Sequence, residues 1–287
     1  MRINIGLAQI YPKLGDVQHN LALHLDYARR ARAAGVDLLI FPELSLTGYQ
    51  VQDLVSEVAL RADADDGVFV QLLEASRELA LDIVVGFVHV DFRKRFYIAN
   101  AYLASGEALH IHHKLYLPTY AMFDESRYFA QGNSVRAFDT RFGRVGMLIC
   151  EDFWHVSPPY LLWLDGADML ILNSSSPSRG LNDSDRLMGT RWVEHVNQAY
   201  GSMFTSYILH CNRVGYEDGK NFWGGSSVVD PDGEFMTHGL YFDEALITQT
   251  IDLNQLHRTR ARLPLLRDER PGLVRRELGR ILSENLG

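Results

Sequence analysis

The sequence predicts an α/β protein in which two β-sheets pack face to face and helices cover their outer sides. One observation behind this is that apolar runs typical of buried strands alternate with segments of helical spacing. A second is a hairpin pattern, with strands at residues 98–104 and 108–113 joined by a turn at Ser105 and Gly106. A mixture of hairpins and βα units favours a layered sandwich over a single doubly wound sheet.

A short internal sequence repeat, called the echo below, indicates that the protein has two similar halves. Residues 35–40, Gly-Val-Asp-Leu-Leu-Ile, resemble residues 166–171, Gly-Ala-Asp-Met-Leu-Ile, and a predicted helix precedes each segment. Two α-then-β halves would produce such a repeat. The echo is short, and a pattern shared by many αβ loops accounts for it equally well.

The first elements can be justified one at a time. Residues 3–10 have the branched apolar composition of a strand. A helix is predicted over 17–34, because Asp16 can cap its first turn, apolar residues follow at helical spacing, and Gly35 can end it. The apolar run 36–41 predicts the next strand. The other expected elements, in chain order, are a helix at 68–80, strands at 82–90, 98–104, 108–113 and 145–149, a helix at 159–164, a strand at 168–172, a helix at 185–200, and strands at 202–211, 225–229 and 245–251.

Composition limits the classes to which the protein can belong. The chain has 287 residues, of which 47% are hydrophobic and 22% charged, and this is enough for a large core. No linker or low-complexity stretch divides it, so residues 1–287 are predicted to form one domain. The formal net charge of -8 argues against a surface for nucleic acid or anionic membrane. No signal-like start and no apolar stretch of roughly 18 residues is present, which predicts a soluble, cytoplasmic protein.

Cys150 is the strongest candidate for a chemical role. It follows the predicted strand at 145–149 and precedes Glu151 and Asp152, so its thiol would lie at a strand end beside acidic groups. Strand ends hold reactive side chains rigidly at the rim of a sheet. A buried apolar cysteine is the commoner alternative, and the acidic neighbours argue against it. Cys211, in a strand-like run, is expected to be such a buried residue, and a disulfide between the two cysteines would need a special context.

Three charged residues are candidate partners of the thiol. Glu43 follows the strand predicted at 36–41 and could take a proton, and Lys114 follows the strand at 108–113 and could hold a thiolate or an oxyanion. Glu125 lies in a loop rich in aromatic and charged residues, which is typical of a pocket wall. Judged alone, each has a simpler interpretation: a solvated or helix-capping carboxylate, an exposed strand-end lysine, and a residue of a surface loop.

No metal site is expected. His110, His112 and His113 include a pair on one strand face, but no downstream Cys or His at metal-ligand spacing completes a site. No CxxC motif is present either.

Three segments occur in an order that resembles the nitrilase, or carbon–nitrogen hydrolase, superfamily. They are residues 41–43 (Phe-Pro-Glu), 113–118 (His-Lys-Leu-Tyr-Leu-Pro) and 148–152 (Leu-Ile-Cys-Glu-Asp). The resemblance extends over nearly the whole chain. It implies a four-layer α-β-β-α sandwich, in agreement with the prediction above, and subunits that pair into a homodimer or a higher homo-oligomer. The tail at about 257–287 would then be an interface segment.

The resemblance also implies roles for individual residues. Cys150 would be the nucleophile, Glu43 the general base, Lys114 the oxyanion stabiliser and Glu125 an assisting carboxylate. The backbone N–H of Glu151 would be a second oxyanion donor, and no metal or organic cofactor would be needed. The substrate-binding residues would be Tyr49, Tyr120, Glu151 and Ser176.

Within the superfamily, residues 120–129 and 150–154 look most like the glutaminase domains of glutamine-dependent NAD synthetases. True nitrilases usually carry Trp-Glu after the cysteine, and Glu151 and Asp152 depart from that pattern, which favours amides over nitriles. No segment resembles the SGGxDS motif of the synthetase domain. The chain is therefore expected to be an amidase that cleaves a small primary amide, glutamine-like amides included, to acid and ammonia. The alternatives are a nitrilase acting on R–C≡N, and a partner-dependent glutaminase subunit that supplies ammonia to a separate synthetase.

Overall fold

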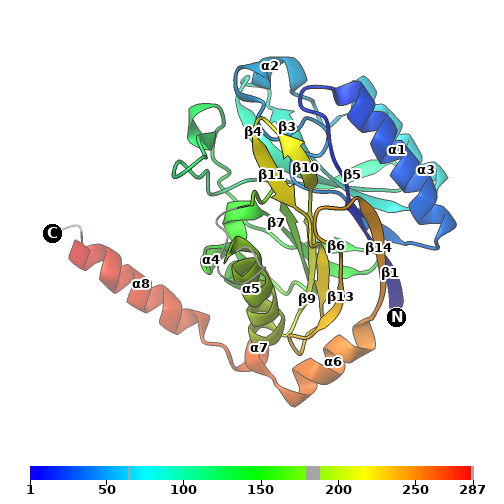
Figure 1. The fold of residues 1–287 in the computed structure, drawn as a ribbon. Helices are drawn as coiled ribbons and strands as arrows, with labels where there is room; N and C mark the ends of the chain where they lie inside the picture. Colours follow the sequence, from blue (N-terminus) through cyan, green and yellow to red (C-terminus); the bar gives the residue numbers. More distant parts are fainter. Residues whose placement is uncertain (64, 179–187, 286–287) are drawn as a thin grey trace.

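Two six-stranded sheets pack face to face at the centre of the molecule (Figure 1). The computed structural model describes residues 1–63, 65–178 and 188–285, and both sheets lie within these ranges. Helices cover the outer face of each sheet, so the predicted α-β-β-α order of layers is confirmed. The four covering helices are α1 (Val17–Ala33) and α3 (Gly67–Glu78) on one side, and α4 (Ser157–Leu164) and α5 (Met188–Phe204) on the other.

The first sheet has a parallel centre and antiparallel edges. In spatial order its strands are β14 (Ala245–Asp252), β1 (Arg2–Gln9), β2 (Leu38–Ile40), β3 (Asp82–Val90), β4 (Phe96–Ala104) and β5 (Glu107–His113). The strands β1, β2 and β3 run parallel, and the remaining pairs are antiparallel. Parallel neighbours bring their carboxyl ends to one edge of the sheet, and this edge carries the site described below.

The second sheet repeats this plan. In spatial order its strands are β13 (Phe235–His238), β12 (Ser227–Val229), β9 (Tyr207–Asn212), β8 (Met169–Ser174), β7 (Gly143–Ile149) and β6 (Phe138–Thr140). Here β7, β8 and β9 form the parallel centre. Side chains such as Ile5, Leu38, Met147 and Ile171 fill the space between the sheets and are almost completely buried.

The short echo in the sequence corresponds to a structural equivalence. The segments 35–40 and 166–171 contain β2 and β8, which are the middle strands of the two parallel centres. The aspartate before each strand, Asp37 or Asp168, accepts a hydrogen bond from a backbone N–H of the neighbouring strand, at 2.9 Å and 3.1 Å respectively. The repeated Gly-x-Asp-x-Leu-Ile pattern therefore starts the same strand in each half.

Most predicted elements are present with shifted ends, but one boundary is wrong. Residues 202–204, expected to begin a strand, form the last turn of α5, and β9 begins only at Tyr207. The ring of Phe204 packs against Trp163 and Tyr200, with centroids 5.4 Å and 5.3 Å apart. This packing continues the helix, and local propensity cannot report it. The predicted start of this helix, at residues 185–187, lies outside the described residues.

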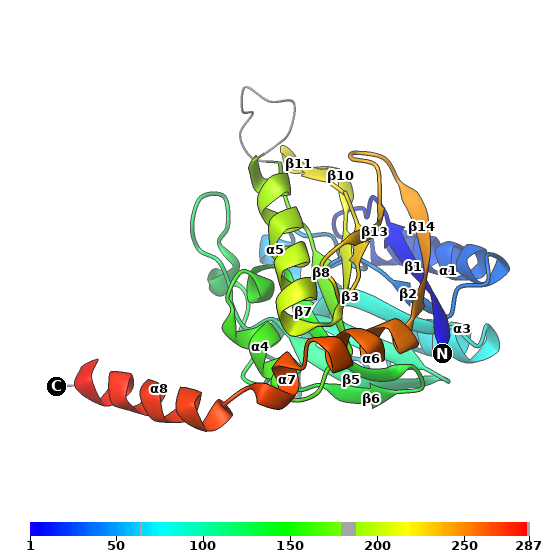
Figure 2. The same ribbon diagram turned by 90° about the horizontal axis from the view of Figure 1, so that it is seen from below.

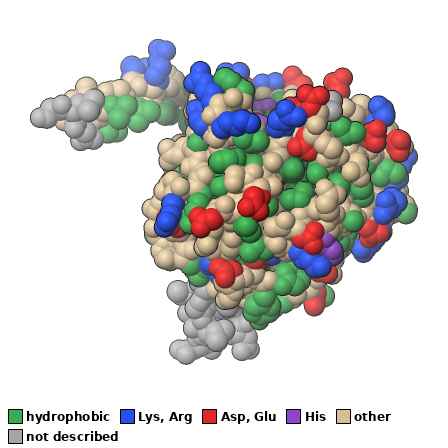
Figure 3. Space-filling model, turned by 90° about the horizontal axis from the view of Figure 1, so that it is seen from above, with side chains coloured by type: hydrophobic (Ala, Val, Ile, Leu, Met, Phe, Trp, Pro, Cys, Tyr) green, Lys and Arg blue, Asp and Glu red, His purple; other side chains and the backbone are tan. Residues whose placement is uncertain are grey.

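Several elements had no expected counterpart. They are the edge strands β6 and β13, the hairpin of β10 (Val214–Glu217) and β11 (Lys220–Trp223), and the helices α2 (Val55–Val58), α6 (Leu253–Arg262), α7 (Leu265–Asp268) and α8 (Pro271–Asn285). Helix α8 projects from the sandwich (Figures 1 and 2), and Figure 3 shows hydrophobic and basic side chains exposed along it. Over the described residues, every helix falls short of the length or the apolarity that a membrane span requires.

Candidate active site

Four predicted site residues come together at the carboxyl edge of the parallel strands. Glu43 follows β2, Lys114 follows β5, and Cys150 starts a 3₁₀ turn after β7. Glu125 starts a second 3₁₀ turn, in the loop after β5. All four side chains are buried, with exposed fractions of 0%, 1%, 7% and 5% for Glu43, Lys114, Cys150 and Glu125. The simpler interpretations, in which the three charged groups lie at the surface, are therefore wrong.

The Lys114 amine joins the two carboxylates. Its Nζ donates to Glu43 Oε1 at 2.7 Å and to Glu125 Oε1 at 2.8 Å. The hydroxyl of Tyr49 donates to the same Glu125 oxygen at 2.6 Å. Because charges lose the stabilisation of water when they are buried, such a cluster is tolerated only where opposite charges and hydrogen bonds compensate one another.

The backbone around Glu43 is fixed from two sides. The N–H of Ser175 donates to Glu43 Oε2 at 2.8 Å, and the Ser175 hydroxyl donates to the Glu43 carbonyl at 2.9 Å. From the other side, Gly86 of β3 approaches so closely that a Cβ there would lie 2.3 Å from the Pro42 oxygen. Only glycine fits beneath this turn, and the carboxylate is therefore held rigidly at the strand end.

Asp152 fixes the turn that carries Cys150. Cys150 has φ of 45°, a left-handed conformation that costs energy for a residue with a side chain. The buried Asp152 carboxylate compensates by accepting four hydrogen bonds. The donors are the backbone N–H groups of Leu115 (2.8 Å), Tyr116 (3.0 Å) and Ile149 (3.1 Å), and His112 Nε2 (2.9 Å).

This carboxylate ties the segment after Lys114 to the segment around Cys150, yet no role was expected for Asp152. Its place directly after Glu151 was the available signal. The order of residues does not reveal which of the two acids turns inward.

Replacing Asp152 by asparagine should destabilise the protein by about 2–3 kcal/mol, because two buried donors would then face an amide NH₂. The loss should appear in denaturant unfolding. Asp139→Asn is a matched control, because that carboxylate pairs with Arg144 at 3.0 Å but is 83% exposed. It should change stability by less than about 0.5 kcal/mol. Equal effects of the two variants would show that Asp152 does not anchor the turn.

Burial and charge set the protonation of the cluster. Burial, and then Glu43, raise the pKa of the Cys150 thiol well above its ordinary value, although Lys114 opposes them. Burial raises the pKa of Glu125 to about 7, against the opposing effect of Lys114. For Lys114, burial disfavours the charge, but Glu125 and Glu43 outweigh it and raise its pKa well above the usual value. At neutral pH the raised thiol pKa favours the neutral form of Cys150, the raised lysine pKa favours the Lys114 cation, and the pKa of Glu125 lies close to the pH of the solution.

A pocket opens beside Cys150. Three of the predicted substrate-binding residues, Tyr120, Glu151 and Ser176, line it together with the thiol. The Tyr120 hydroxyl donates to Glu151 Oε2 at 3.0 Å, so these two residues form one polar wall. Aromatic side chains, among them Trp223, form much of the remainder.

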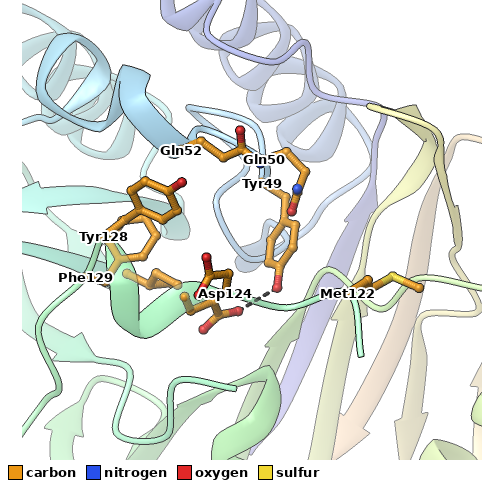
Figure 4. A pocket seen from close by; sticks show the side chains of 9 residues that line it. Tyr49, Gln50, Gln52, Met122, Asp124, Tyr128 and Phe129 are labelled. Atoms are coloured by element: carbon orange, nitrogen blue, oxygen red, sulfur yellow. Dashed lines mark hydrogen bonds between the residues drawn. The ribbon is translucent and has the colours of Figure 1, made fainter. Parts of the chain in front are cut away.

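The fourth predicted substrate-binding residue, Tyr49, lines a different cavity. This second cavity is bounded by Tyr49, Glu125, Tyr128 and neighbouring residues (Figure 4). Cys150 is not among its lining residues. Figure 4 shows the Tyr49 hydroxyl pointing into this cavity, and the dashed line at this hydroxyl marks its hydrogen bond to Glu125. Glu125 Oε2 is buried and has no hydrogen-bond partner among the described residues.

The three histidines of the β5 segment have separate partners. His112 bonds to Asp152, and His113 Nε2 lies 2.8 Å from His89 Nδ1. The ring of His110 stacks on Phe138. In the described part of the chain, no three His, Cys, Asp or Glu side chains gather in a way that could hold a metal ion.

The four-layer sandwich thus buries a thiol, two carboxylates and an amine together at one edge of its sheets. Residues 4–261 match the family model described as carbon-nitrogen hydrolase, and the chain belongs to this family of hydrolases acting on carbon–nitrogen bonds. The resemblance seen in the sequence is confirmed.

Two relatives and one solved structure illustrate the relationship. A glutamine-dependent NAD(+) synthetase of Thermotoga maritima is 35% identical over an alignment of 259 residues, which covers 88% of this chain and 43% of that protein. A probable nitrilase of Schizosaccharomyces pombe is 25% identical and matches 97% of this chain and 99% of its own length. The crystal structure of a carbon-nitrogen hydrolase from Helicobacter pylori G27 superimposes with a TM-score of 0.86 at 20% identity, covering 97% of this chain and 99% of that one, and so shares the fold. The chain spans less than half the length of the NAD synthetases that it matches.

Proposed function

We propose that the protein is an amidase that hydrolyses a small primary amide to a carboxylic acid and ammonia through a thioester on Cys150. The observation that carries this proposal is the buried bridge of Lys114 between Glu43 and Glu125, next to the thiol. A buried cation flanked by two carboxylates supplies an acceptor for a proton and a donor for an oxyanion within one rigid cluster.

The first half of the reaction forms the thioester. Because the thiol is neutral at rest, Glu43 takes its proton as Sγ attacks the amide carbon. The carbonyl oxygen becomes an oxyanion, which Lys114 Nζ and the Glu151 N–H stabilise. Glu43 then returns the proton to the amide nitrogen, the C–N bond breaks, and ammonia leaves.

The second half releases the acid. A water molecule gives its proton to Glu43 and attacks the thioester carbon, which forms a second oxyanion in the same place. The C–S bond then breaks, and the proton on Glu43 returns to the sulfur. Glu125 assists in both halves because its Oε1 holds Lys114 in position at 2.8 Å.

The lining of the cavity beside Cys150 supports an amide that carries an amino group, such as a glutamine-like one. Glu151 contributes a carboxylate, and Tyr120 and Ser176 contribute hydroxyls to the same wall. A carboxylate in a partly buried wall favours an ammonium ion over a purely aliphatic chain. Glu151 is also the nearest candidate for recognising that ammonium, since its side chain lies one residue from the thiol.

The test is ammonia release from a panel containing aliphatic amides, glutamine, asparagine and nitriles, together with intact-protein mass spectrometry. We expect turnover of primary amides and a transient acyl adduct on Cys150. Turnover of nitriles without turnover of amides would overturn the proposal in favour of a nitrilase, for which the full-length match to a probable nitrilase is the supporting observation.

A partner-dependent glutaminase is the second candidate. Its support is the match to glutamine-dependent NAD synthetases, of which this chain spans less than half. In that case the folded protein would hydrolyse none of the amides until a synthetase partner is added. Rapid turnover of an amide by the purified chain would exclude such a requirement.

The pH dependence of kcat/KM should have an acid limb near pH 7. Glu125, whose pKa is about 7, loses the negative charge that holds Lys114 when it is protonated, so activity falls as pH decreases through that value. Glu125→Gln should lower kcat and abolish this limb. Asp124→Asn is the matched control, because Asp124 lines the same cavity but is 60% exposed, and it should leave the limb in place. An unchanged limb in Glu125→Gln would assign the titration to another group.

Assembly into a homodimer or a higher homo-oligomer is part of the same proposal. The exposed apolar residues of α8, Leu273, Val274, Leu278, Ile281 and Leu282, support the interface role expected for the tail. Sedimentation velocity of the full chain and of a chain ending before α8 would test this. Identical monomer populations in both would contradict an interface in the tail.

A further inference from the structure

A buried ion pair lies beside Tyr49, and the proposed reaction does not use it. Arg213 is completely buried and Glu217 is 6% exposed, and Arg213 Nη1 lies 2.6 Å from Glu217 Oε2. Glu217 is the last residue of β10, the first strand of the β10–β11 hairpin, and Arg213 directly precedes that strand. Removing two charges from water is unfavourable unless their partners compensate. The hydrogen bonds that this pair makes therefore indicate its role.

The ion pair holds the backbone of the Tyr49 segment. Glu217 Oε1 accepts from the N–H of Tyr49 at 2.8 Å and from the N–H of Gln50 at 2.7 Å. Gly48, with φ of 80°, lets the chain pass: a Cβ there would lie 3.0 Å from Glu217 Oε2 and 2.6 Å from the Leu14 backbone. The position of Tyr49 is therefore set by a carboxylate that itself depends on Arg213.

The same pair also supports the Tyr49 ring. The Arg213 guanidinium stacks over the Phe222 ring at 4.3 Å, and Phe222 meets the Tyr49 ring edge-on with centroids 5.9 Å apart. Held at its backbone and at its ring, Tyr49 places its hydroxyl 2.6 Å from Glu125 Oε1.

We propose that Arg213 and Glu217 are positioning residues that fix the Tyr49 hydroxyl on Glu125 and so control the ionisation of Glu125. This inference rests on the proposed amidase function, in which ionised Glu125 holds Lys114. Neither residue lines the cavity beside Cys150 or the cavity beside Tyr49, so we assign them a role that acts through Tyr49.

Four groups face Glu125 from the elements packed around it: Lys114 after β5, Glu43 after β2, Cys150 after β7, and Tyr49. Among these four, Tyr49 is the group bonded to Glu217. A hydrogen bond from its hydroxyl stabilises the ionised carboxylate, so its loss must raise the pKa of Glu125.

The first experiment compares kcat/KM profiles of wild type, Glu217→Gln, Tyr49→Phe and the double variant. Glu217→Gln should move the acid limb upward by up to about one pH unit, because one hydrogen bond to a charged group has roughly that effect. It should also lower kcat on the order of tenfold while KM changes little, because the ground-state pocket beside Cys150 is intact. The double variant should shift no further than Tyr49→Phe alone. Additive shifts would overturn the proposal, since they would show that the pair acts by a route other than Tyr49.

A second readout does not need the enzyme to be active. Carbon-13 NMR of protein labelled at the Glu carboxyl carbons reports the Glu125 titration, with its signal identified by its absence in Glu125→Gln. We expect the same upward shift in Glu217→Gln and in Tyr49→Phe. An unshifted titration would overturn the positioning role even if amide turnover is found. A shifted titration without any amide turnover would keep the positioning role and reject the amidase.

Asp168→Asn is the matched control. Asp168 pairs with Arg260 at 2.7 Å and accepts from a backbone N–H, as Glu217 does, but it lies at the start of β8, at the opposite end of the sheet. It should reduce stability without moving the acid limb, and an equal shift in both variants would show a general effect of destabilisation.

If Glu217→Gln does not fold, Phe222→Leu is the alternative variant. It keeps the ion pair and removes the ring support, and it should give a smaller upward shift of the acid limb. If the acid limb shifts in Tyr49→Phe but not in Phe222→Leu, Phe222 does not support the Tyr49 ring.

Discussion

Replacing Cys150 by alanine should reduce ammonia release by at least about 10⁴-fold while the protein remains folded, because alanine has no thiol with which to form the proposed thioester. Cys150 is nearly buried and its thiol is neutral, so alanine removes one sulfur atom without exposing a charge. The acyl adduct should disappear from the intact-mass spectrum, and the melting temperature should stay within a few degrees. Turnover retained by this variant would reject the thiol mechanism.

Cys211→Ala is the matched control for this result. Cys211 is also buried, and its thiol lies 3.2 Å from the Ile40 carbonyl in the space between the sheets, away from the cavity of the site. Its replacement should cost about 1 kcal/mol of stability and leave kcat/KM unchanged, because it removes packing alone. Comparable losses of activity in both variants would indicate a general need for either thiol in the fold.

Replacing Lys114 by methionine should abolish turnover and lower the free energy of unfolding by about 3–5 kcal/mol, because two buried carboxylates would lose their shared cation. The loss should be larger at pH 8 than at pH 5. In the native protein Glu125 already has a pKa raised from 4.5 to about 7, so its contribution to stability is complete below about 4.5 and is lost as pH rises through 7. Without Lys114 this folded-state pKa rises further, and the penalty for ionising Glu125 grows in alkaline solution.

Two further variants separate charge from packing. The triple variant Glu43→Gln, Lys114→Met, Glu125→Gln should recover much of the lost stability but no activity, because no buried charge is left unpaired. Lys94→Met, at an exposed lysine, should change stability by less than about 0.5 kcal/mol. Undiminished turnover by Lys114→Met would remove Lys114 from the proposed oxyanion site.

The fold was largely predictable because its signals are local. Buried strands of the two parallel centres are nearly continuous apolar runs, and helices α1 and α3 are capped by Asp16 and Asp66, which accept from backbone N–H groups of their first turns. Elements whose existence depends on distant contacts were not predictable. Helix α5 continues to Phe204 because of aromatic packing, and the edge strands β6 and β13 form because a neighbouring strand offers unpaired backbone groups.

The candidate site divides in the same way. Glu43, Lys114 and Cys150 were recognisable because each chemically distinctive residue lies within three positions after the end of a strand, and strand ends meet at one edge. The sequence by itself determined the layered fold and the family, and it predicted these three candidate residues. Only the tertiary structure decided that Tyr49 bonds to Glu125, 76 positions away, and that Glu217 anchors Tyr49 across 168 positions. The physical reason is that a strand pattern depends on neighbouring residues, whereas the direction of a buried side chain depends on which distant donors and charges are packed against it.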